Sequence, residues 1–288
     1  MSAHPALVRD NTFVITGAQP GGIGFESAFL LLDRFGLKGV LADVSKDGLE
    51  GAREELIKRG VAEDRFTTRV TDVSNSADVD DLAEFAFSTY GKVDFLMLNA
   101  GISMPSKSFG GDRESWDKIL AVNLHGAING QQAFVEKMVA QQTPAAVVIT
   151  GSKQGITNPP GNPAYNASKA AVKSLAEGLA HALLDTPVSA HLLVPGWTWT
   201  RLGAGGNAPE LDKKPAAAWT GAQVAEELFA RLDEFYIICP DNDVTWELDQ
   251  ARMQYNLDDI LLKRPALSRW NPAFADSYAK YIEKKLAQ

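Results

Sequence analysis

Tyr165 and Lys169 are the residues whose types and spacing point most directly to chemistry. They stand four positions apart in the segment Tyr165-Asn166-Ala167-Ser168-Lys169, so in a helix both side chains project from one face. A free phenol has a pKa of about 10, which is too high for a base near neutrality. An ammonium group about 4 Å away, at an effective dielectric of about 20, would stabilise the phenolate by on the order of 4 kcal/mol. We therefore predict that Tyr165 is a general acid/base that exchanges a proton with an alcohol or a ketone.

Ser152 adds a second polar group where this chemistry needs one. It follows the apolar run Ala145–Thr150 by two residues, and open α/β sheets bind their ligands beyond the carboxyl ends of the strands. A hydroxyl there can hold the substrate oxygen without itself titrating. A Tyr-x-x-x-Lys spacing alone is common on helix surfaces, so the prediction depends on the combination with Ser152.

The segment from Thr16 to Gly24, Thr-Gly-Ala-Gln-Pro-Gly-Gly-Ile-Gly, has the composition of a phosphate-binding turn. It follows the first expected strand and opens the first expected helix, where bare backbone and unpaired N–H groups can approach a pyrophosphate. Asp43, at the end of the second expected strand, can accept hydrogen bonds from both ribose hydroxyls and would repel a 2′-phosphate. The pattern predicts NAD as the cofactor. NADP is the less favoured alternative, kept open by the nearby Lys46.

These residues need a sheet to bring them together, and residues 12 to about 195 carry the pattern of one. Short β-branched runs alternate with longer helical patterns, which is typical of a parallel sheet with crossover helices, and the runs are continuously apolar, as in strands covered on both faces. We predict a Rossmann-like, doubly wound α/β fold. Its strands are expected at Thr12–Thr16, Gly39–Asp43, Phe66–Thr71, Val93–Asn99, Ala145–Thr150 and Val188–Val194, and its helices near 22–35, 46–59, 76–90, 115–141 and 163–184.

The pattern changes beyond Pro195-Gly196. Residues 202–218 are rich in Gly, Ala and Pro, which is typical of a surface loop, so 201–219 is predicted as a substrate lid and a linker is the alternative. Further helices are expected near 220–233, 244–262 and 273–286, with a strand-like segment at 235–240. We expect a single domain, in which an NAD-binding catalytic part at 1–240 carries a helical C-terminal extension, 241–288, packed on it.

The composition argues against several classes of protein. With a formal net charge of −8 and no run of Lys and Arg, the chain is not expected to bind nucleic acid. Cys239 is the single cysteine, so no intrachain disulfide can form. The sequence shows neither a signal-peptide pattern nor an apolar stretch of about 18 residues, which predicts a cytoplasmic protein without a membrane span. The four histidines lack metal-ligand spacing, so no metal is expected.

Five motifs in a fixed order give the sequence a wider resemblance. They are Thr16-Gly17 to Gly24, Asp72-Val73, Leu98-Asn99-Ala100-Gly101, Ser152 with Tyr165 and Lys169, and Pro195-Gly196 with Thr200. By these motifs the chain, from about Asn11 to Thr200, resembles the short-chain dehydrogenase/reductase family. The resemblance implies a catalytic tetrad of Asn123, Ser152, Tyr165 and Lys169. In that family the Asn helps to hold a water that relays protons to the Lys, and the Lys also grips the nicotinamide ribose.

The resemblance also implies a cofactor site. Asp72 and Val73 would border the adenine, Asn99 would line the cofactor cleft, and Thr198 and Thr200 would meet the carboxamide or the diphosphate. The full expected set is Gly17, Gln19, Gly22, Ile23, Gly24, Asp43, Asp72, Val73, Asn99, Ala100, Gly101, Tyr165, Lys169, Pro195, Gly196, Thr198 and Thr200. Taken singly, Asp72 also fits an Asx cap, Asn99 a loop amide and Asn123 ordinary helix packing.

Two features depart from the family pattern. The glycine-rich loop is one residue longer than the usual Thr-Gly-x-x-x-Gly-x-Gly, which leaves the role of each glycine open. The chain also continues for about fifty residues past Pro240, where relatives usually end in a strand and a glycine-rich terminus that build an interface. We expect a homodimer or a homotetramer.

The substrate pocket is expected under the segments that follow the fourth, fifth and sixth strands. Those segments offer Met104, Gln154, Trp197 and Trp199. Two tryptophans beside the nicotinamide end favour a bulky apolar or cyclic substrate, and the alternative is that both rings fill the core. The sequence thus predicts an oxidoreductase that transfers a hydride between NAD(H) and a secondary alcohol or ketone. The alternatives are a catalytically silent NAD-binding or redox-sensing protein, and a dehydratase, epimerase or cyclase on the same scaffold.

Overall fold

The computed structural model describes residues 4–202 and 209–287 of the chain. Its main sheet consists of β1 (Thr12–Thr16), β2 (Lys38–Asp43), β3 (Phe66–Val70), β4 (Phe95–Leu98), β5 (Ala145–Thr150), β6 (Val188–Val194) and β9 (Tyr236–Ile238). The strands lie in the order β3-β2-β1-β4-β5-β6-β9, and every neighbouring pair is parallel. The order reverses between β1 and β4, and sheets of this type bind ligands at that switch point.

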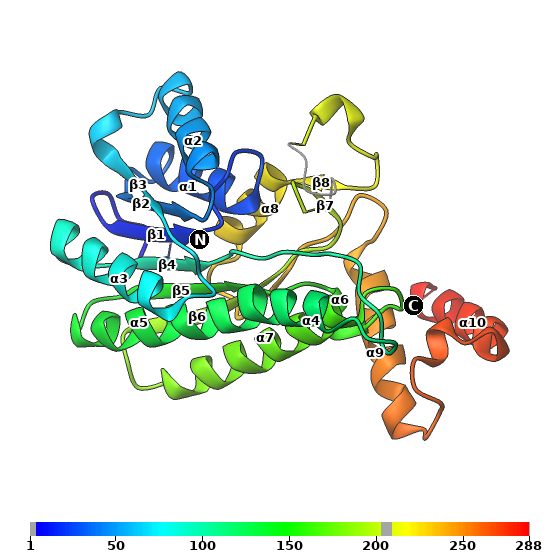
Figure 1. The fold of residues 1–288 in the computed structure, drawn as a ribbon. Helices are drawn as coiled ribbons and strands as arrows, with labels where there is room; N and C mark the ends of the chain where they lie inside the picture. The colour runs from blue at the N-terminus through cyan, green and yellow to red at the C-terminus, as the bar shows by residue number, and fades with distance from the viewer. Residues whose placement is uncertain (1–3, 203–208, 288) are drawn as a thin grey trace.

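Helices cover both faces of the sheet, as the apolar strands require. They are α1 (Ile23–Asp33), α2 (Lys46–Lys58), α3 (Ser76–Tyr90), α4 (Arg113–Leu120), α5 (Gly126–Ala140), α6 (Gln154–Thr157), α7 (Pro163–Ala182), α8 (Gly221–Ala230), α9 (Trp246–Leu261) and α10 (Ala275–Leu286). In Figure 1, α1 and α8 lie on one side of the sheet, and α3, α5 and α7 lie on the other. The predicted Rossmann-like, doubly wound α/β domain is confirmed.

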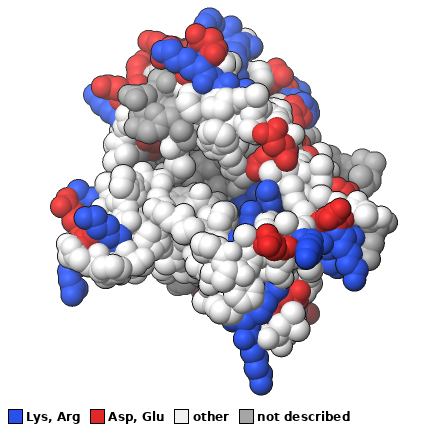
Figure 2. All heavy atoms as spheres, turned by 90° about the vertical axis from the view of Figure 1, so that its right-hand side faces the viewer, with Lys and Arg blue, Asp and Glu red and all other residues white. Residues whose placement is uncertain are grey.

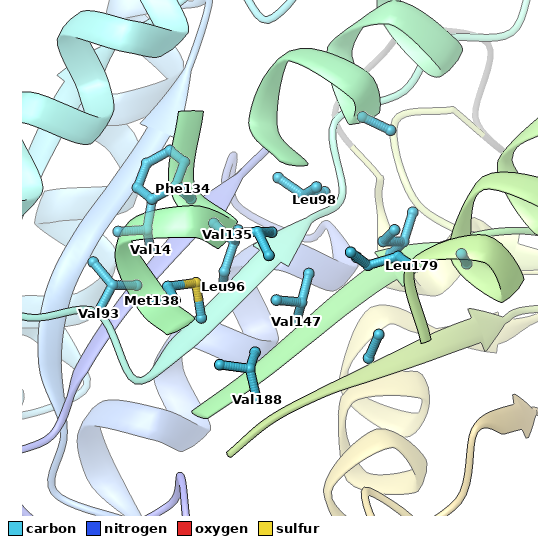
Figure 3. Close-up of a cluster of buried hydrophobic side chains, with 14 of the residues drawn as sticks. Val14, Val93, Leu96, Leu98, Phe134, Val135, Met138, Val147, Leu179 and Val188 are labelled. Carbon is cyan, nitrogen blue, oxygen red and sulfur yellow. The ribbon is translucent and has the colours of Figure 1, made fainter. Parts of the chain in front are cut away.

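Side chains on the two faces of the sheet pack into two separate hydrophobic cores. Val14 and Leu96 pack with Phe134 and Met138 of α5, in the cluster shown in Figure 3. Phe13, the neighbour of Val14, points into the opposite cluster, which α1, α2 and α8 help to form. Successive side chains of a strand point to opposite faces, and each fully buried Leu or Phe contributes roughly 1.5–3 kcal/mol. The two cores therefore hold the carboxyl ends of the strands in place.

The predicted helix at 115–141 is interrupted, which corrects the sequence prediction. A π-helical turn, Ala121–His125, joins α4 to α5 and contains Asn123. A π turn shifts the register of a helix by one residue, which apolar spacing cannot reveal, and such turns are frequent at functional sites. The other expected helices and strands are present, with ends that differ by up to a few residues.

Several short elements were not predicted, because they are too short to carry a periodic signal. They are α6, the parallel pair of β7 (Thr198–Trp199) and β8 (Trp219–Thr220), and the 3₁₀ turns Glu63–Arg65, Leu211–Lys213, Ser268–Trp270 and Pro272–Phe274. In the chain, the predicted lid, 201–219, follows β7 and ends at the start of β8. Residues 203–208 of that lid lie outside the described residues.

The C-terminal segment from residue 241 onward, the predicted extension, lies near α6 (Figure 1). Asn256 Nδ2 of α9 donates a hydrogen bond to the Ile156 carbonyl at 3.2 Å. Tyr255, also on α9, is buried, and the rings of Tyr278 and Tyr281 on α10 each lie 5.0 Å from its ring. The extension therefore has a small aromatic core of its own. Within residues 4–202 and 209–287, no helix has both the length and the apolar character that crossing a bilayer requires.

Candidate active site

Backbone geometry explains the glycines between β1 and α1. Gly17 and Gly21 have φ angles of +71° and +76°, in the left-handed region that glycine tolerates. Gly22 immediately precedes α1. A Cβ on Gly24 would stand 2.6 Å from the Gly17 carbonyl oxygen, so this glycine permits close packing of the helix on the turn. Bare backbone therefore surrounds the N-terminus of α1, an arrangement that fits a pyrophosphate.

Asn99 ties this loop to the neighbouring strands at the switch point. Its Nδ2 donates to the carbonyls of Thr16 and Gly17, at 3.1 and 3.0 Å. Its Oδ1 accepts from Thr150 Oγ1 at 3.1 Å. The Thr150 carbonyl in turn accepts from Lys169 Nζ at 2.8 Å. One chain of hydrogen bonds thus links the glycine-rich loop to the ammonium group on α7.

Asp43 ends β2 with a fixed carboxylate. Its Oδ1 accepts from Gln19 Nε2 at 2.8 Å and from the Ser45 N–H at 3.0 Å. Burial raises the pKa of Asp43, while these hydrogen bonds and the charge of Arg201 oppose the rise. A carboxylate held at this position fits the hydroxyls of a ribose. Together with the glycine cradle, it makes the residues present suitable for a dinucleotide.

The first turn of α7 places Tyr165 and Lys169. Asn162 caps the helix, and its Oδ1 accepts from the Tyr165 N–H at 3.4 Å. Pro163 occupies the start of the helix, where its missing N–H is not needed. Lys169 follows one turn later on the same face, with Nζ 5.8 Å from the centre of the Tyr165 ring. The expected neighbourhood of the two side chains is therefore present.

Burial, rather than charge, dominates the protonation of this pair. Tyr165 is 8% exposed and Lys169 is 4% exposed. Burial raises the pKa of Tyr165, and the Ser152 hydroxyl opposes the rise. Burial also lowers the pKa of Lys169 to about 8. Desolvation disfavours the charged form of both groups, so it opposes the stabilisation of the phenolate that the spacing of Tyr165 and Lys169 predicts.

Most of the predicted site residues line one cavity. Its volume is about 460 Å³, within the usual range of small-molecule sites. From the predicted set it is lined by Gly17, Gln19, Gly22, Ile23, Asp43, Asn99, Ala100, Gly101, Ser152, Gln154, Tyr165, Lys169, Pro195, Gly196, Trp197, Thr198 and Thr200. The structure does not bring Gly24, Asp72, Val73, Met104, Asn123 or Trp199 to its wall.

The residues outside the wall have identifiable local contacts. Asp72 Oδ1 accepts from the backbone N–H and the hydroxyl of Ser74, at 2.9 and 2.7 Å, as an Asx cap does. Val73 and Asn123 line a much smaller cavity that shares Ala100 and Thr150 with the large one. The Trp199 indole N–H donates to the Glu210 carbonyl at 2.9 Å, so this ring supports the base of the lid.

Asn123 holds the backbone around Tyr165. Its Oδ1 accepts from the Ile102 N–H at 2.8 Å, and its Nδ2 donates to the Ile102 carbonyl and to Ser168 Oγ, at 3.0 Å each. The Ser168 hydroxyl donates to the Tyr165 carbonyl at 2.7 Å. Asn123 thereby connects the loop after β4 with the first turn of α7. Ser168 was not singled out in the sequence, since a helical serine carries no distinctive signal.

The cavity has a second, charged end that sequence reasoning missed. Six further residues line it: Lys153, Asp241, Asp249, Arg252, Arg269 and Trp270. Arg201, whose charge acts on Asp43, also lines the cavity. A Cβ on Gly196 would overlap the Asp241 carboxylate, so this glycine lets the C-terminal extension approach the loop after β6. Arg201 directly follows the Thr200 of a recognised motif. Lys153 directly follows Ser152 of another motif, and the remaining residues come from the C-terminal extension, beyond the motifs.

Fold and cavity together define the class as a dinucleotide-binding α/β protein with a polar cluster beyond the nucleotide site. Residues 11–210 match the family described as short chain dehydrogenase. The chain belongs to this family, as its five motifs predicted. It is accordingly an oxidoreductase.

Known relatives agree with this assignment. The 3beta-hydroxysteroid dehydrogenase 2 of Eggerthella lenta is 30% identical over 221 residues, which are 76% of this chain and 82% of that protein. A short chain dehydrogenase/reductase from Burkholderia phymatum, in complex with NAD, is 30% identical with a TM-score of 0.77 and covers 89% of this chain and 96% of its own. An alcohol dehydrogenase from Thermococcus sibiricus, complexed with 5-hydroxy-NADP, is 26% identical with a TM-score of 0.67 over 78% and 91%. These neighbours support a nicotinamide cofactor of either type.

Proposed function

We propose that the protein transfers a hydride between NAD(H) and a secondary alcohol or ketone, with Tyr165 as the general acid/base. The observation that carries the proposal is that Tyr165, Ser152 and Lys169 line the same cavity as the glycine-rich loop and Asp43. Bound at that loop, NAD(H) supplies the acceptor or donor of the hydride. The rest of the chemistry belongs to side chains of this chain.

Ser152 and Tyr165 share the oxygen of the substrate in this proposal. The Ser152 hydroxyl positions that oxygen, and Tyr165 Oη gives it a proton during reduction or takes its proton during oxidation. Since burial raises the pKa of Tyr165, the acid form prevails near neutrality. Ketone reduction is therefore favoured at neutral pH, and alcohol oxidation gains rate as the pH rises.

Lys169 and Asn123 support Tyr165 in different ways. The ammonium of Lys169, held by the Thr150 carbonyl, lies beside the phenol and favours its ionised form when the proton leaves. Both N–H groups of the Asn123 side chain are already used within the protein. Asn123 is therefore proposed as a positioning residue for α7.

NAD is the proposed form of the cofactor. The Asp43 carboxylate, held by Gln19 and Ser45, suits a free ribose and repels a 2′-phosphate. The positive charge of Arg201 acts on Asp43. Because a cation attracts a 2′-phosphate, Arg201 is the residue that would favour NADP. We expect kcat/KM to be at least about tenfold higher with NAD(H) than with NADP(H), which corresponds to a free-energy difference of about 1.4 kcal/mol. A preference for NADP(H) in the same assay would contradict this part of the proposal.

The substrate is proposed to be bulky and apolar or cyclic. Trp197 lines the cavity and is 49% exposed, so its ring is available for contact with a substrate. The name of the relative from Eggerthella lenta refers to a hydroxysteroid, which is a molecule of this kind. We also propose that the chain assembles as a homodimer or homotetramer and that its NAD-binding catalytic part ends near residue 240.

Replacement of Tyr165 by Phe tests the proposed role. Loss of the general acid/base is expected to lower kcat by about 10²–10⁴-fold, while NADH binding, followed by fluorescence, changes little. Tyr236→Phe is the matched control, because that phenol lies on the exposed edge strand β9 and is not among the residues that line the cavity. Unchanged turnover in Tyr165→Phe would contradict the proposal.

The assay also separates the alternative functions. The wild-type protein is assayed against a panel of cyclic and aromatic alcohols and ketones. Tight NADH binding with no turnover on the whole panel would favour a silent nucleotide-binding protein. Conversion of substrate without net change in NADH would favour a dehydratase, epimerase or cyclase.

A further inference from the structure

The charged end of the cavity contains two arginines that the proposed hydride transfer does not use. Arg252 of α9 and Arg269, in the 3₁₀ turn Ser268–Trp270, line the cavity together with Ser152 and Tyr165. Figure 2 shows the hollow on this face of the molecule, with Lys and Arg atoms along part of its edge. Both arginines belong to the C-terminal extension, where the family motifs have ended.

The packing of α9 directs Arg252 toward the catalytic loop. Asp249, Arg252 and Asn256 recur at helical spacing and share one face of α9. Asp249 pairs with Lys153 Nζ at 2.5 Å, and Asn256 bonds to Ile156. Lys153 immediately follows Ser152 in the chain. The face that carries Arg252 therefore meets the segment after β5.

The nearby carboxylates are already engaged by another cation. Lys153 Nζ lies 3.3 Å from Asp241 and 2.5 Å from Asp249. Within residues 4–202 and 209–287, no salt bridge joins either Arg252 or Arg269 to a carboxylate. The Arg252 Nε atom is buried without a hydrogen-bond partner. A buried, unpaired donor on a cation is costly, and an anion in the cavity would satisfy it.

Arg269 is held in place before any ligand arrives. Its guanidinium lies 4.4 Å from the Trp270 ring and 5.4 Å from the Tyr278 ring. Burial lowers the pKa of Arg269 and the charge of Arg252 acts in the same direction, whereas Tyr278 and the charge of Asp249 act against them. The two guanidinium groups thus lie beside one cavity and repel each other, and the Asp249 carboxylate offsets part of that repulsion. A single anion between them would relieve that repulsion.

We infer that Arg252 and Arg269 bind a carboxylate of the substrate, while its carbonyl or hydroxyl group faces Ser152 and Tyr165. Guanidinium groups match carboxylates in shape and charge and form strong paired hydrogen bonds with them. Trp197 and Trp270 line the same cavity and suit an aromatic or alicyclic body between the two ends. The substrate class is therefore a keto acid or hydroxy acid with such a body. This inference rests on the proposed function of the same cavity.

Matched substrates test the carboxylate site. A series of aryl and cycloalkyl ketones is assayed with NADH, each compound once as its free carboxylate and once as its neutral methyl ester. We expect a higher kcat/KM for the carboxylates. Arg252→Gln and Arg269→Gln should each lower kcat/KM for the carboxylates by about 10–100-fold, mainly through KM, and leave the esters within about threefold. Lys280→Gln removes an exposed cation of α10. It should leave kcat/KM unchanged for both the carboxylates and the esters.

A purely structural role for the arginines predicts different results. The inference is overturned if the esters are the better substrates, or if both arginine variants weaken carboxylate and ester turnover alike. Thermal unfolding provides the second readout. Arg252→Gln should keep the melting temperature of the wild type, because it removes an unpaired buried donor, and a loss of many degrees would indicate a structural role.

Binding separates this inference from the proposed function. Cyclohexanecarboxylate, which has no ketone to reduce, is titrated while tryptophan fluorescence is followed, with cyclohexanecarboxamide as the neutral comparison. Selective binding of the carboxylate that is lost in Arg252→Gln supports the anion site even if no ketone is reduced. Equal binding of the two compounds overturns it, whatever the outcome for Tyr165→Phe.

Discussion

At the scale of single residues, burial determines how Tyr165 and Lys169 hold their protons. Lys169 is enclosed, and its described hydrogen bond runs to the Thr150 carbonyl. An enclosed ammonium loses hydration that one carbonyl only partly replaces, so the neutral amine is favoured relative to water. The lowered pKa of Lys169 therefore reflects a free-energy cost of keeping the charge. This cost lowers the free energy of unfolding at any pH where Lys169 is charged in the folded protein.

The pH dependence of stability should reveal this cost. In the unfolded chain Lys169 keeps its proton up to a pKa of 10.5, whereas in the folded protein its pKa is about 8. Between these values the unfolded state binds more protons, so the contribution of Lys169 to stability rises with pH. We expect the free energy of unfolding of the wild type, relative to Lys169→Met, to increase by up to about 3 kcal/mol between pH 8 and 10.5.

Urea unfolding at a series of pH values measures this difference. The comparison with Lys169→Met cancels the titration of other groups, such as Cys239, whose pKa burial raises to about 12. A flat difference between the two proteins across this range would mean that Lys169 keeps an ordinary pKa. A falling difference would mean that the ammonium is stabilised rather than penalised.

At the scale of elements, the turn from β1 to α1 depends on close contacts between backbones. Gly24 lies in the first turn of α1, where its missing side chain lets the helix sit directly against the Gly17 carbonyl and the Asn99 amide. The same Asn99 amide bonds to that carbonyl. Any atom added at Gly24 must therefore push the helix away from the loop. The nucleotide site and the packing of α1 should be disturbed together.

Gly24→Ala should weaken both stability and cofactor binding. Its Cβ would meet Gly17 O at 2.6 Å and Asn99 Nδ2 at 2.7 Å, and such overpacking costs typically about 1–3 kcal/mol. We expect the dissociation constant for NADH to rise by about tenfold or more, since the donors of the loop move away from their positions. Calorimetry and urea unfolding measure the two effects.

Gly178→Ala is the matched control for this substitution. Gly178 lies within α7, and a Cβ there would meet nothing within 4 Å. Alanine in such a position stabilises a helix by about 0.5–1 kcal/mol. NADH binding should stay at the wild-type value. If Gly24→Ala behaves like Gly178→Ala, the close packing of the loop does not control the nucleotide site.

At the scale of the whole molecule, the C-terminal extension completes the wall of the cavity. Lys153 is the connection, because it follows Ser152 and pairs with Asp241 and Asp249 from the extension. All three side chains are 15% exposed or less. Removing one partner of a partly desolvated ion pair lowers the stability of the fold strongly, since the remaining charge is left without compensation.

Lys153→Met should therefore destabilise the protein by about 3–5 kcal/mol. It leaves two carboxylates close together without a cation between them. Removing Asp249 as well should recover part of the loss, so a double-mutant cycle of Lys153→Met with Asp249→Asn is expected to show coupling of about 1–3 kcal/mol. Urea unfolding of the wild type, the two single variants and the double variant measures this coupling.

Lys118→Met provides the comparison for an exposed pair. Lys118 and Glu114 pair across one turn of α4, with 56% and 80% of their side chains exposed. Pairs of this kind contribute about 0.3–0.5 kcal/mol. A loss in Lys153→Met as small as that in Lys118→Met would show that the extension is held by its other contacts.

Local patterns predicted the sheet and much of the cavity. Apolar strands, turn glycines and helical spacing are properties of neighbouring residues, so β1 to β6 could be read with small errors at their ends. The motifs also sit at the ends of strands, where a parallel sheet brings them to one edge. For that reason Gly17, Asp43, Ser152 and Tyr165 line one cavity.

The errors arose where a property depends on contacts between distant segments. Met104 and Trp199 lie in the expected loops, but the loops do not present them to the cavity. The π-helical turn at Asn123 follows from packing against the loop after β4, which no spacing reveals.

The sequence by itself determined the fold class, the family and the chain positions of the proposed catalytic groups, because each depends on local spacing or on a single backbone requirement. Tertiary structure alone decided the direction of the pKa shifts of Tyr165 and Lys169, since burial depends on what covers a side chain. It also decided that Arg252 and Arg269 share a cavity with Ser152. Contacts across about a hundred residues, such as Asn256 with Ile156, bring them there.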